Sequence, residues 1–190
     1  MNNLSNVTQV EPAHTHPLQW YALKVFYNKV FDVEDLLKKA HVESYIPVED
    51  VVIENNGHRK LRRRPVINSL MFVRTDVPML KHLLSGPLCN QALVYLNAER
   101  NAPAAISERD FEVFRLVTSH GHEGLEYFCD EAMVNLSTGQ KVRVIEGPFK
   151  GTEGYIKRIR RDRRILVVIH GIVAVATSYI APEFLEVIDD

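Results

Sequence analysis

The order of apolar and polar residues predicts alternating strands and helices over residues 18–119. Aromatic and β-branched residues form an apolar run at 20–25, which is typical of a strand. Apolar residues then recur at helical spacing from Val30 to Ala40, with acidic residues early and lysines late, as the helix dipole favours. Similar patterns predict strands at 44–48, 51–54, 70–73 and 92–96. This order is typical of an α+β fold with a largely antiparallel sheet flanked by helices.

Two further helices have clear start signals. Asp76 is placed to cap a helix, and Pro78 is tolerated in its first turn. Ser107 is placed to cap another, and Ile106 and Phe111 flank it at the spacing of a hydrophobic staple.

The pattern changes to strands alone near the end of the chain. Glycines and polar residues at 119–124 end the last helix and begin a linker. Beyond residue 135, about five short β-branched runs predict a small β-barrel, because closure removes exposed strand edges. The chain is therefore divided into four parts: a disordered tail (1–17), an α+β domain (18–119), a linker (120–134) and a barrel domain (135–190).

A glycine-rich turn is the most informative short segment. Gly147, Gly151 and Gly154 lie between two predicted strands, where glycine allows positive φ or close backbone approach at a sharp bend. We expect Phe149 and Lys150 to lie at the tip of this turn.

Composition narrows the class of protein. The 190 residues are 46% hydrophobic and 25% charged, which is ordinary for a globular protein. A net charge of −1 excludes strong bulk attraction to nucleic acid. Cys89 and Cys129 lie far apart and favour a reducing compartment. No apolar run is long enough to span a membrane, and residues 1–17 lack the features of a signal peptide.

Two basic segments, 58–64 and 157–164, stand out in this neutral chain. Such clusters indicate surfaces for phosphate or for acidic protein, but they also occur on solvated hairpin edges, where they prevent aggregation. For the first segment, which contains Arg62, Arg63 and Arg64, we favour binding. For the second segment, 157–164, binding and a solvated hairpin edge are equally supported.

An apolar group around the central strand is a candidate partner site. It comprises Trp20, Tyr21, Ile67, Leu70 and Phe72. Because strand residues alternate between faces, Leu70 and Phe72 share one face and the intervening residues the other. One face belongs to the core. The other is either core as well or an exposed apolar hollow that binds a partner.

Catalytic and metal-binding patterns are weak. The sequence has no nucleophile elbow, phosphate loop or HExxH motif. His120, His122 and Cys129 lack the two compact ligand pairs of a structural zinc site. We therefore expect no enzyme activity, no metal and no cofactor.

These features together resemble the NusG family from residue 20 to residue 188. The first part is similar to the NusG N-terminal (NGN) domain, and the glycine-rich turn is similar to the KOW motif of a small SH3-like barrel. The matching segments are 20–21, 65–73, 104–107 and 142–156. Segments 67–74, 125–128, 135–139 and 171–177 further resemble the UpxY-type antiterminators of surface-polysaccharide operons.

The resemblance implies a protein that binds RNA polymerase and suppresses pausing or termination. In the family an apolar NGN patch binds polymerase, and here Trp20, Tyr21, Ile67, Leu70 and Phe72 match it. The usual aromatic-Pro-Gly/Asn-Tyr run is replaced at 67–70, so aliphatic residues take the place of aromatic anchors.

Further partners follow from the same resemblance. Lys24, Asn28 and Lys29 lie where relatives contact non-template DNA, and leader RNA is the other candidate ligand. The KOW domain of relatives recruits a small-subunit ribosomal protein or Rho. We expect a cytoplasmic monomer that acts on a capsule operon. The alternatives are a general NusG-like elongation factor and a KOW protein that binds RNA in translation.

Overall fold

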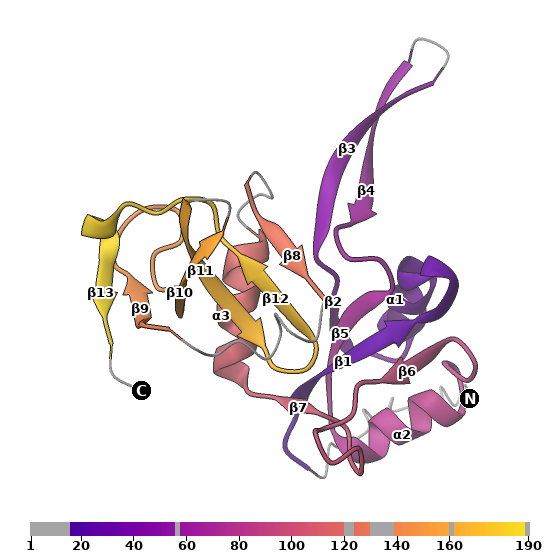
Figure 1. Ribbon diagram of the computed structural model, residues 1–190. Helices are drawn as coiled ribbons and strands as arrows, with labels where there is room; N and C mark the ends of the chain where they lie inside the picture. Colours follow the sequence, from indigo (N-terminus) through magenta and orange to yellow (C-terminus); the bar gives the residue numbers. More distant parts are fainter. Residues whose placement is uncertain (1–15, 56–57, 120–123, 130–138, 160–161, 189–190) are drawn as a thin grey trace, which may run out of the picture.

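The computed structural model describes residues 16–55, 58–119, 124–129, 139–159 and 162–188. Figure 1 shows helices and a sheet from the first part of the chain, a curved sheet from the last part, and a long two-stranded arm. The strands are β1 (Gln19–Val25), β2 (Glu43–Tyr45), β3 (Val48–Asn55), β4 (His58–Pro65), β5 (Leu70–Thr75), β6 (Ala92–Val94), β7 (Ala105–Ile106), β8 (Glu126–Phe128), β9 (Lys141–Val144), β10 (Glu153–Ile159), β11 (Asp162–Ile169), β12 (Val173–Ala176) and β13 (Leu185–Val187). The α-helices are α1 (Val30–Lys39), α2 (Val77–Ser85) and α3 (Glu108–Ser119), and short 3-10 helices occupy Phe26–Asn28 and Pro182–Phe184.

The N-terminal sheet has the order β2-β5-β1-β6, and β7 also pairs with β1. Strand β1 pairs antiparallel with β5, β6 and β7, and β2 pairs antiparallel with β5. One face, which includes Tyr21 and Met71, packs against α1 and α2. The other face, which includes Trp20 and Phe72, packs against α3. The sheet is therefore covered on both sides.

Both predicted caps are confirmed. The Asp76 carboxylate accepts a hydrogen bond from the Met79 backbone N–H at 2.8 Å. The Ser107 hydroxyl accepts one from the Asp110 N–H at 3.1 Å, and Ile106 and Phe111 are both buried.

The C-terminal sheet has six antiparallel strands in the order β13-β9-β10-β11-β12-β8. It curves around its own apolar residues, and α3 packs against β11. Helix α3 thus lies between the two sheets, and the buried side chains of both sheets form one continuous cluster. The α+β fold class with a small barrel-like second sheet is confirmed.

The glycine-rich turn uses its glycines in two ways. Gly147 and Gly151 have φ of 87° and 89°, a conformation that L-residues rarely adopt. Gly154 has no such φ, but a Cβ there would lie 2.6 Å from the Leu166 carbonyl oxygen. Glycine is therefore required at position 154 because strand β10 approaches β11 too closely for a side chain.

Strand β8 lies within the segment that the sequence analysis assigned to a linker. It pairs with β12, with Tyr127 opposite Val175. The remainder of that linker, at 120–123 and 130–134, lies outside the described residues, as do residues 1–15 of the predicted tail at 1–17. The division into domains remains a prediction.

Candidate functional site

The structure buries the five residues predicted to contact polymerase. Their exposed fractions are 1% for Trp20 and Tyr21, 9% for Ile67, 2% for Leu70 and 0% for Phe72. Tyr21 faces the opposite side of the sheet from the other four and packs with α1 and α2. The prediction of an exposed apolar hollow at these positions is therefore wrong for this arrangement, because both faces of the sheet are covered.

An aromatic cluster covers the face that carries Phe72. Trp20 stacks on Phe111 of α3 with ring centroids 3.6 Å apart. Phe72 lies 5.4 Å from Phe111 and 5.2 Å from Phe114. The Tyr45 and Thr118 hydroxyls share a hydrogen bond of 2.6 Å at the edge of this cluster. The sequence did not reveal this cover, since it depends on where α3 packs.

The C-terminal sheet adds a second layer over the same face. Leu125 and Tyr127 pack against the buried cluster. Burial raises the pKa of the Tyr127 hydroxyl, and nearby Tyr45 and Glu49 raise it further. Strand β8 therefore lies close to β2 and β3.

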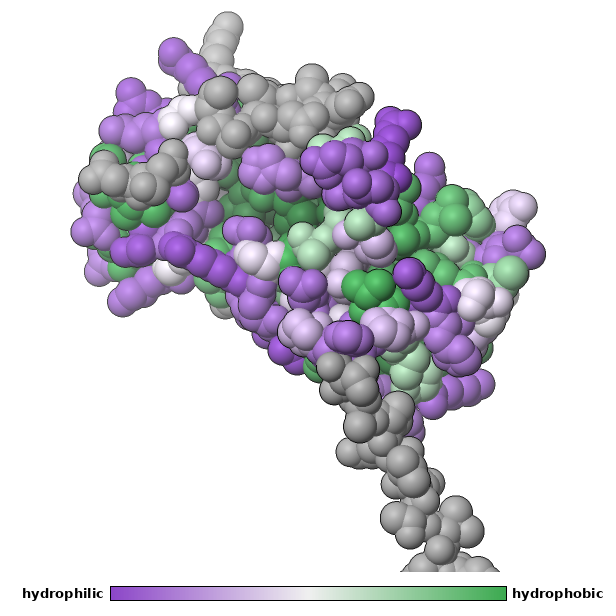
Figure 2. Space-filling model, turned by 90° about the horizontal axis from the view of Figure 1, so that it is seen from below, coloured by the Kyte–Doolittle hydropathy of each residue, from purple (hydrophilic) through white to green (hydrophobic). Residues whose placement is uncertain are grey.

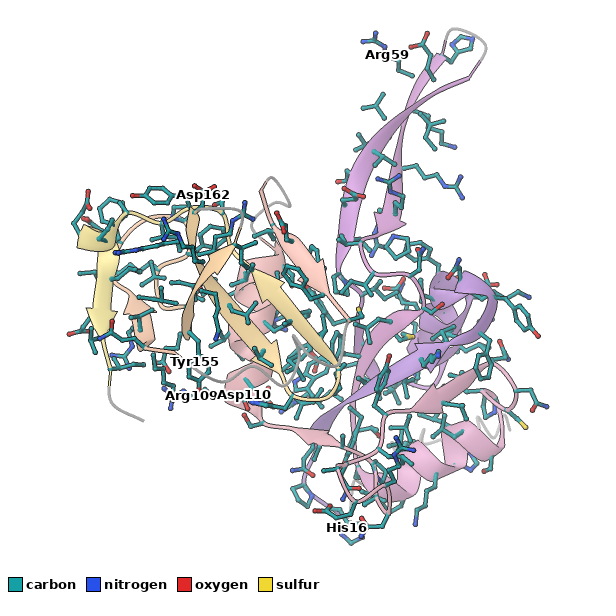
Figure 3. All side chains as sticks on the ribbon, viewed as in Figure 1. His16, Arg59, Arg109, Asp110, Tyr155 and Asp162 are labelled. Carbon is teal, nitrogen blue, oxygen red and sulfur yellow. The ribbon has the colours of Figure 1, made fainter. Side chains whose placement is uncertain are left out.

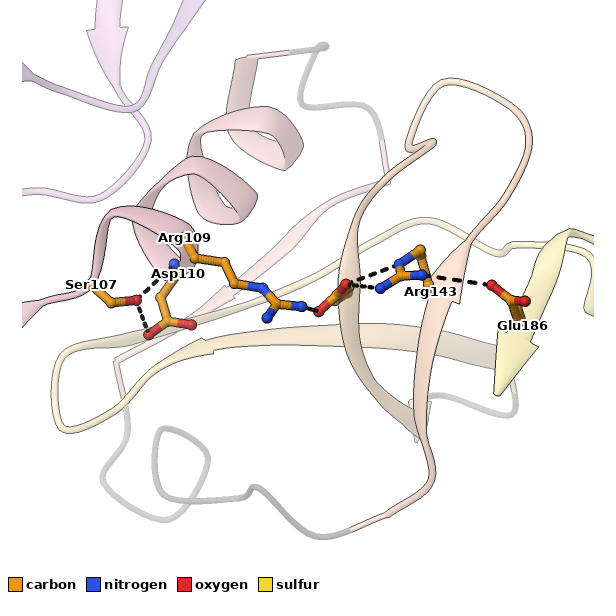
Figure 4. A network of polar contacts seen from close by, with 6 residues as sticks. Ser107, Arg109, Asp110, Arg143 and Glu186 are labelled. Atoms are coloured by element: carbon orange, nitrogen blue, oxygen red, sulfur yellow. Dashed lines mark hydrogen bonds and ion pairs between the residues drawn. The ribbon is translucent and has the colours of Figure 1, made fainter. Parts of the chain in front are cut away.

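A chain of ion pairs links α3 to the C-terminal sheet (Figure 4). Arg109 of α3 pairs with Glu153 of β10, and the same carboxylate accepts hydrogen bonds from Arg143 of β9 at 2.7 and 2.9 Å. Arg143 also lies 3.8 Å from Glu186 of β13. Figure 3 shows Arg109 and Tyr155 close together, where a cavity of about 160 Å³ separates α3 from the sheet.

The stability that these ion pairs contribute depends on pH through the Glu153 carboxyl. Burial by itself raises the pKa of the Glu153 carboxyl, but hydrogen bonds and positive charges from Arg143 and Arg109 outweigh it and lower the pKa. A carboxyl with a lowered pKa stabilises the fold above its unfolded pKa and loses that contribution as the pH falls through the folded value.

The end of β1 and the turn after it carry the polar residues predicted to contact DNA. Lys24, Asn28 and Lys29 are all exposed. Asn28 accepts a hydrogen bond from the Ser69 hydroxyl at 2.9 Å, which ties this turn to the segment before β5. Asn28 therefore holds the shape of the turn as well as facing solvent.

Tyr27 is a candidate that the sequence analysis missed. Its side chain is 87% exposed, and its φ of 56° places it in the left-handed region. Asn28 follows with φ of 55°. Strained residues persist only where surrounding contacts hold them, and such strain concentrates at functional sites. The one signal in the sequence was an aromatic residue beside Asn28 and Lys29.

The arm formed by β3 and β4 separates the predicted arginines by face. Arg64 pairs with Glu49 at 2.6 Å. Arg63 points to the other face, lying 3.8 Å from Glu34 and 5.3 Å from the centre of the Phe31 ring. Within the described part of the chain, Arg62 has no carboxylate at ion-pair distance, and neither does Lys60 on the same face. Figure 3 places Arg59 near the outer end of the arm.

Two further predictions concern the C-terminal sheet. Phe149 is only 7% exposed and packs in the core, so the expectation that it lies at the tip of the turn is wrong; Lys150 is exposed. In the second basic segment, Arg164 pairs with Glu126 at 3.1 Å, whereas Arg158 and Arg163 are exposed. Arg164 therefore has a structural role, since it joins β11 to β8.

Of the three residues considered as zinc ligands and rejected, His120 and His122 lie outside the described residues, and Cys129 is exposed. Elsewhere in the described ranges, no three His, Cys, Asp or Glu side chains are grouped to hold a metal ion. No helix within those ranges has the length and apolar character needed to cross a bilayer.

Comparison with known proteins gives concordant matches. A family model described as "Transcription termination factor nusG" matches residues 18–115. The chain is 24% identical over 160 residues to the transcription termination/antitermination protein NusG of Neisseria meningitidis serogroup B (strain ATCC BAA-335 / MC58), covering 79% of this chain and 86% of that protein. It is 22% identical over 159 residues to the protein of the same name from Campylobacter jejuni subsp. jejuni serotype O:2 (strain ATCC 700819 / NCTC 11168), covering 78% and 84%.

A solved structure described as "Domain interaction in Thermotoga maritima NusG" is also similar. Its sequence identity is 18% and its TM-score 0.46, over 90% of this chain and 98% of that chain.

Proposed function

The chain belongs to the NusG family of transcription termination and antitermination proteins, and we propose that it is an elongation and antitermination factor that binds RNA polymerase. The family match carries this proposal, and the KOW-like glycine turn of the C-terminal sheet supports it. The protein would act in the cytoplasm as a monomer, without catalytic chemistry. Binding changes pausing only as far as it favours one conformation of polymerase over another.

The burial of the apolar group changes how polymerase binding would work. Ile67, Leu70 and Phe72 contact a partner only if their cover moves away, and for Phe72 that cover includes helix α3 as well as the C-terminal sheet. The Arg109–Glu153 pair joins α3 to the C-terminal sheet, so it opposes the part of this movement in which the sheet leaves α3.

Arg109→Glu is therefore expected to loosen the packing between α3 and the C-terminal sheet. The variant replaces an attraction by a repulsion, and exposed ion pairs contribute about 0.2–1 kcal/mol, so amide exchange in α3 and β11 should quicken about two- to fivefold. Affinity for polymerase should rise if the buried residues make the contact. Arg158→Glu, an exposed change on the strand that carries Glu153, is the control. Unchanged exchange in Arg109→Glu would contradict this role of the pair.

We propose that the turn after β1 binds single-stranded nucleic acid, with Tyr27 stacking on a base and Lys24 and Lys29 near phosphates. Tyr27→Ala is expected to weaken binding of a single-stranded DNA about tenfold, since stacking on an aromatic contributes about 1–3 kcal/mol per base. Tyr27→Phe keeps the ring and should bind like the parent in fluorescence anisotropy. Equal weakening in both variants would exclude stacking.

On the arm, we expect Lys60 and Arg62 to bind phosphate, because neither has a carboxylate at ion-pair distance within the described residues. Arg63 and Arg64, in contrast, already contact other groups. Reversing both, as Lys60→Glu with Arg62→Glu, should weaken DNA binding and reduce the slope of log affinity against log salt by about 1–2. Arg64→Gln should have a smaller effect, since Glu49 already neutralises Arg64. A loss in Arg64→Gln that matches the double variant would overturn this ranking.

We further propose that the target is a surface-polysaccharide operon, as the UpxY-like segments at 67–74 and 171–177 suggest. The test is run-off transcription through a terminator with and without the protein, on the leader of such an operon and on an unrelated template. Read-through on the leader alone supports the specialised role. Read-through on both supports a general NusG-like factor.

Sedimentation with ribosomes and no capture of polymerase would instead support an RNA-binding protein of translation. The same pull-down experiments test for a partner of the KOW domain, either a small-subunit ribosomal protein or Rho.

A further inference from the structure

A groove of about 770 Å³ lies between the edge strand β6 and the turn that joins β11 to β12. Leu93 and Leu96 form its wall on the side of the N-terminal sheet, and Ile172 lies on the other side. Leu93 is 58% exposed and Leu96 49% exposed. Figure 2 shows apolar surface in the hollow between the two halves of the molecule. Exposed apolar side chains gathered in a hollow mark sites where partners bind.

The charged side chains of this groove are all basic. Lys24 and Arg100 line it beside the imidazole of His170, and no aspartate or glutamate does so within the described residues. The chain as a whole has 24 aspartates and glutamates and 23 lysines and arginines, so the excess of positive charge is local to the groove. The nearby Glu99 accepts a hydrogen bond from the Asn97 side chain at 2.7 Å and is not part of the lining. Lys24 and Arg100 have no acidic partner within the described part of the chain.

We propose that this cationic groove binds an extended segment of a partner protein in which acidic residues alternate with large apolar ones. The basic side chains complement the acidic residues, and the leucines complement the apolar ones. Strand β6 is the last strand in the order of its sheet, but the Ala92 N–H of β6 already donates to the Leu88 carbonyl oxygen, so side chains rather than an added strand carry the binding. Single-stranded nucleic acid fits less well, because Tyr95 is half-buried and no other Phe, Tyr or Trp lines the groove among the residues that the structure describes.

A segment in this groove touches both sheets at once. Leu93 and Leu96 belong to the N-terminal side, whereas His170 and Ile172 belong to the C-terminal sheet. Binding therefore favours the packed arrangement over any arrangement in which the sheets separate. The groove and the Arg109–Glu153 pair are thermodynamically coupled, so weakening that pair weakens binding in the groove.

The experiment measures binding of a fluorescent peptide in which leucine alternates with glutamate, using the full-length protein. We expect it to bind about tenfold more tightly than a matched peptide that alternates leucine with lysine. Arg100→Glu and Leu93→Ser should each weaken binding about tenfold, and Arg109→Glu should weaken it a few-fold. Thermal unfolding checks that each variant is folded.

Val187→Glu is the matched control, because Val187 is 57% exposed on β13 and does not line the groove. Equal binding of the two peptides, or equal loss in Val187→Glu, would show non-specific adsorption and overturn the proposal. Displacement of the peptide by a single-stranded oligonucleotide that persists in Tyr27→Ala, which removes the proposed stacking site, would also overturn it. The assay contains no polymerase, so its outcome does not depend on the proposed transcription function.

Discussion

Replacing Phe72 by alanine is expected to lower the free energy of unfolding by about 3–5 kcal/mol, the usual cost of removing a buried phenyl ring. Phe72 is fully buried and packs against Phe111 and Phe114. Its loss leaves a cavity beneath α3, which the aromatic cluster fills only in part. The measurement is urea unfolding followed by the fluorescence of Trp20, the single tryptophan of the chain, which stacks on Phe111.

Leu93→Ala is the control for Phe72→Ala. Leu93 is largely exposed, so its truncation should change stability by less than about 0.5 kcal/mol. The comparison also separates two interpretations of Phe72. A Phe72→Ala protein that keeps its stability but no longer captures polymerase would restore the exposed patch predicted from sequence and contradict the burial described above.

Gly154→Ala is expected to destabilise the C-terminal sheet by about 1–3 kcal/mol, the range found when atoms are added to a well-packed site, and Gly154→Val by more. A Cβ at this position would lie 2.6 Å from both the Leu166 carbonyl oxygen and the Ile165 Cγ2 atom. The Leu166 carbonyl belongs to strand β11, so it cannot move away without disturbing the β10–β11 pairing. Chemical unfolding of the full-length variants tests this.

Gly151 provides a contrast within the same turn. Nothing lies within 4 Å of a Cβ there, but its φ is 89°. Gly151→Ala should therefore cost about 1–2 kcal/mol through backbone strain alone. Gly151→Asn should cost less, because asparagine visits the left-handed region more readily than alanine. If Gly154→Ala is as stable as the parent, close strand approach is not the reason for this glycine.

Local patterns predicted most elements of this fold. Helical spacing from Val30 located α1, and the caps at Asp76 and Ser107 located the starts of α2 and α3. Alternation along 70–73 correctly placed Leu70 and Phe72 on one face and Met71 and Val73 on the other. These signals depend on a few neighbouring residues, so they can be read without knowing the tertiary structure.

The candidate sites were less predictable. An apolar residue on a strand is equally suited to a core or to an exposed patch, and only the packing of α3 shows that Phe72 is core. Phe149 was expected at an exposed tip for the same reason, although it packs inward. Three consecutive arginines looked equivalent, yet strand alternation and the positions of Glu34 and Glu49 leave Arg62 alone among them without an acidic partner within the described residues.

The sequence by itself determined the order of most elements, the two helix caps, the glycines of the sharp turn and the membership of the NusG family. The tertiary structure alone decided which apolar faces are covered, that Glu126–Phe128 is a strand of the C-terminal sheet, and that a basic groove lies beside β6. The physical reason is the distance along the chain over which each kind of interaction acts. Periodicity and capping act between residues a few positions apart, whereas burial and surface charge depend on contacts such as Arg109 with Glu153, which are distant in sequence.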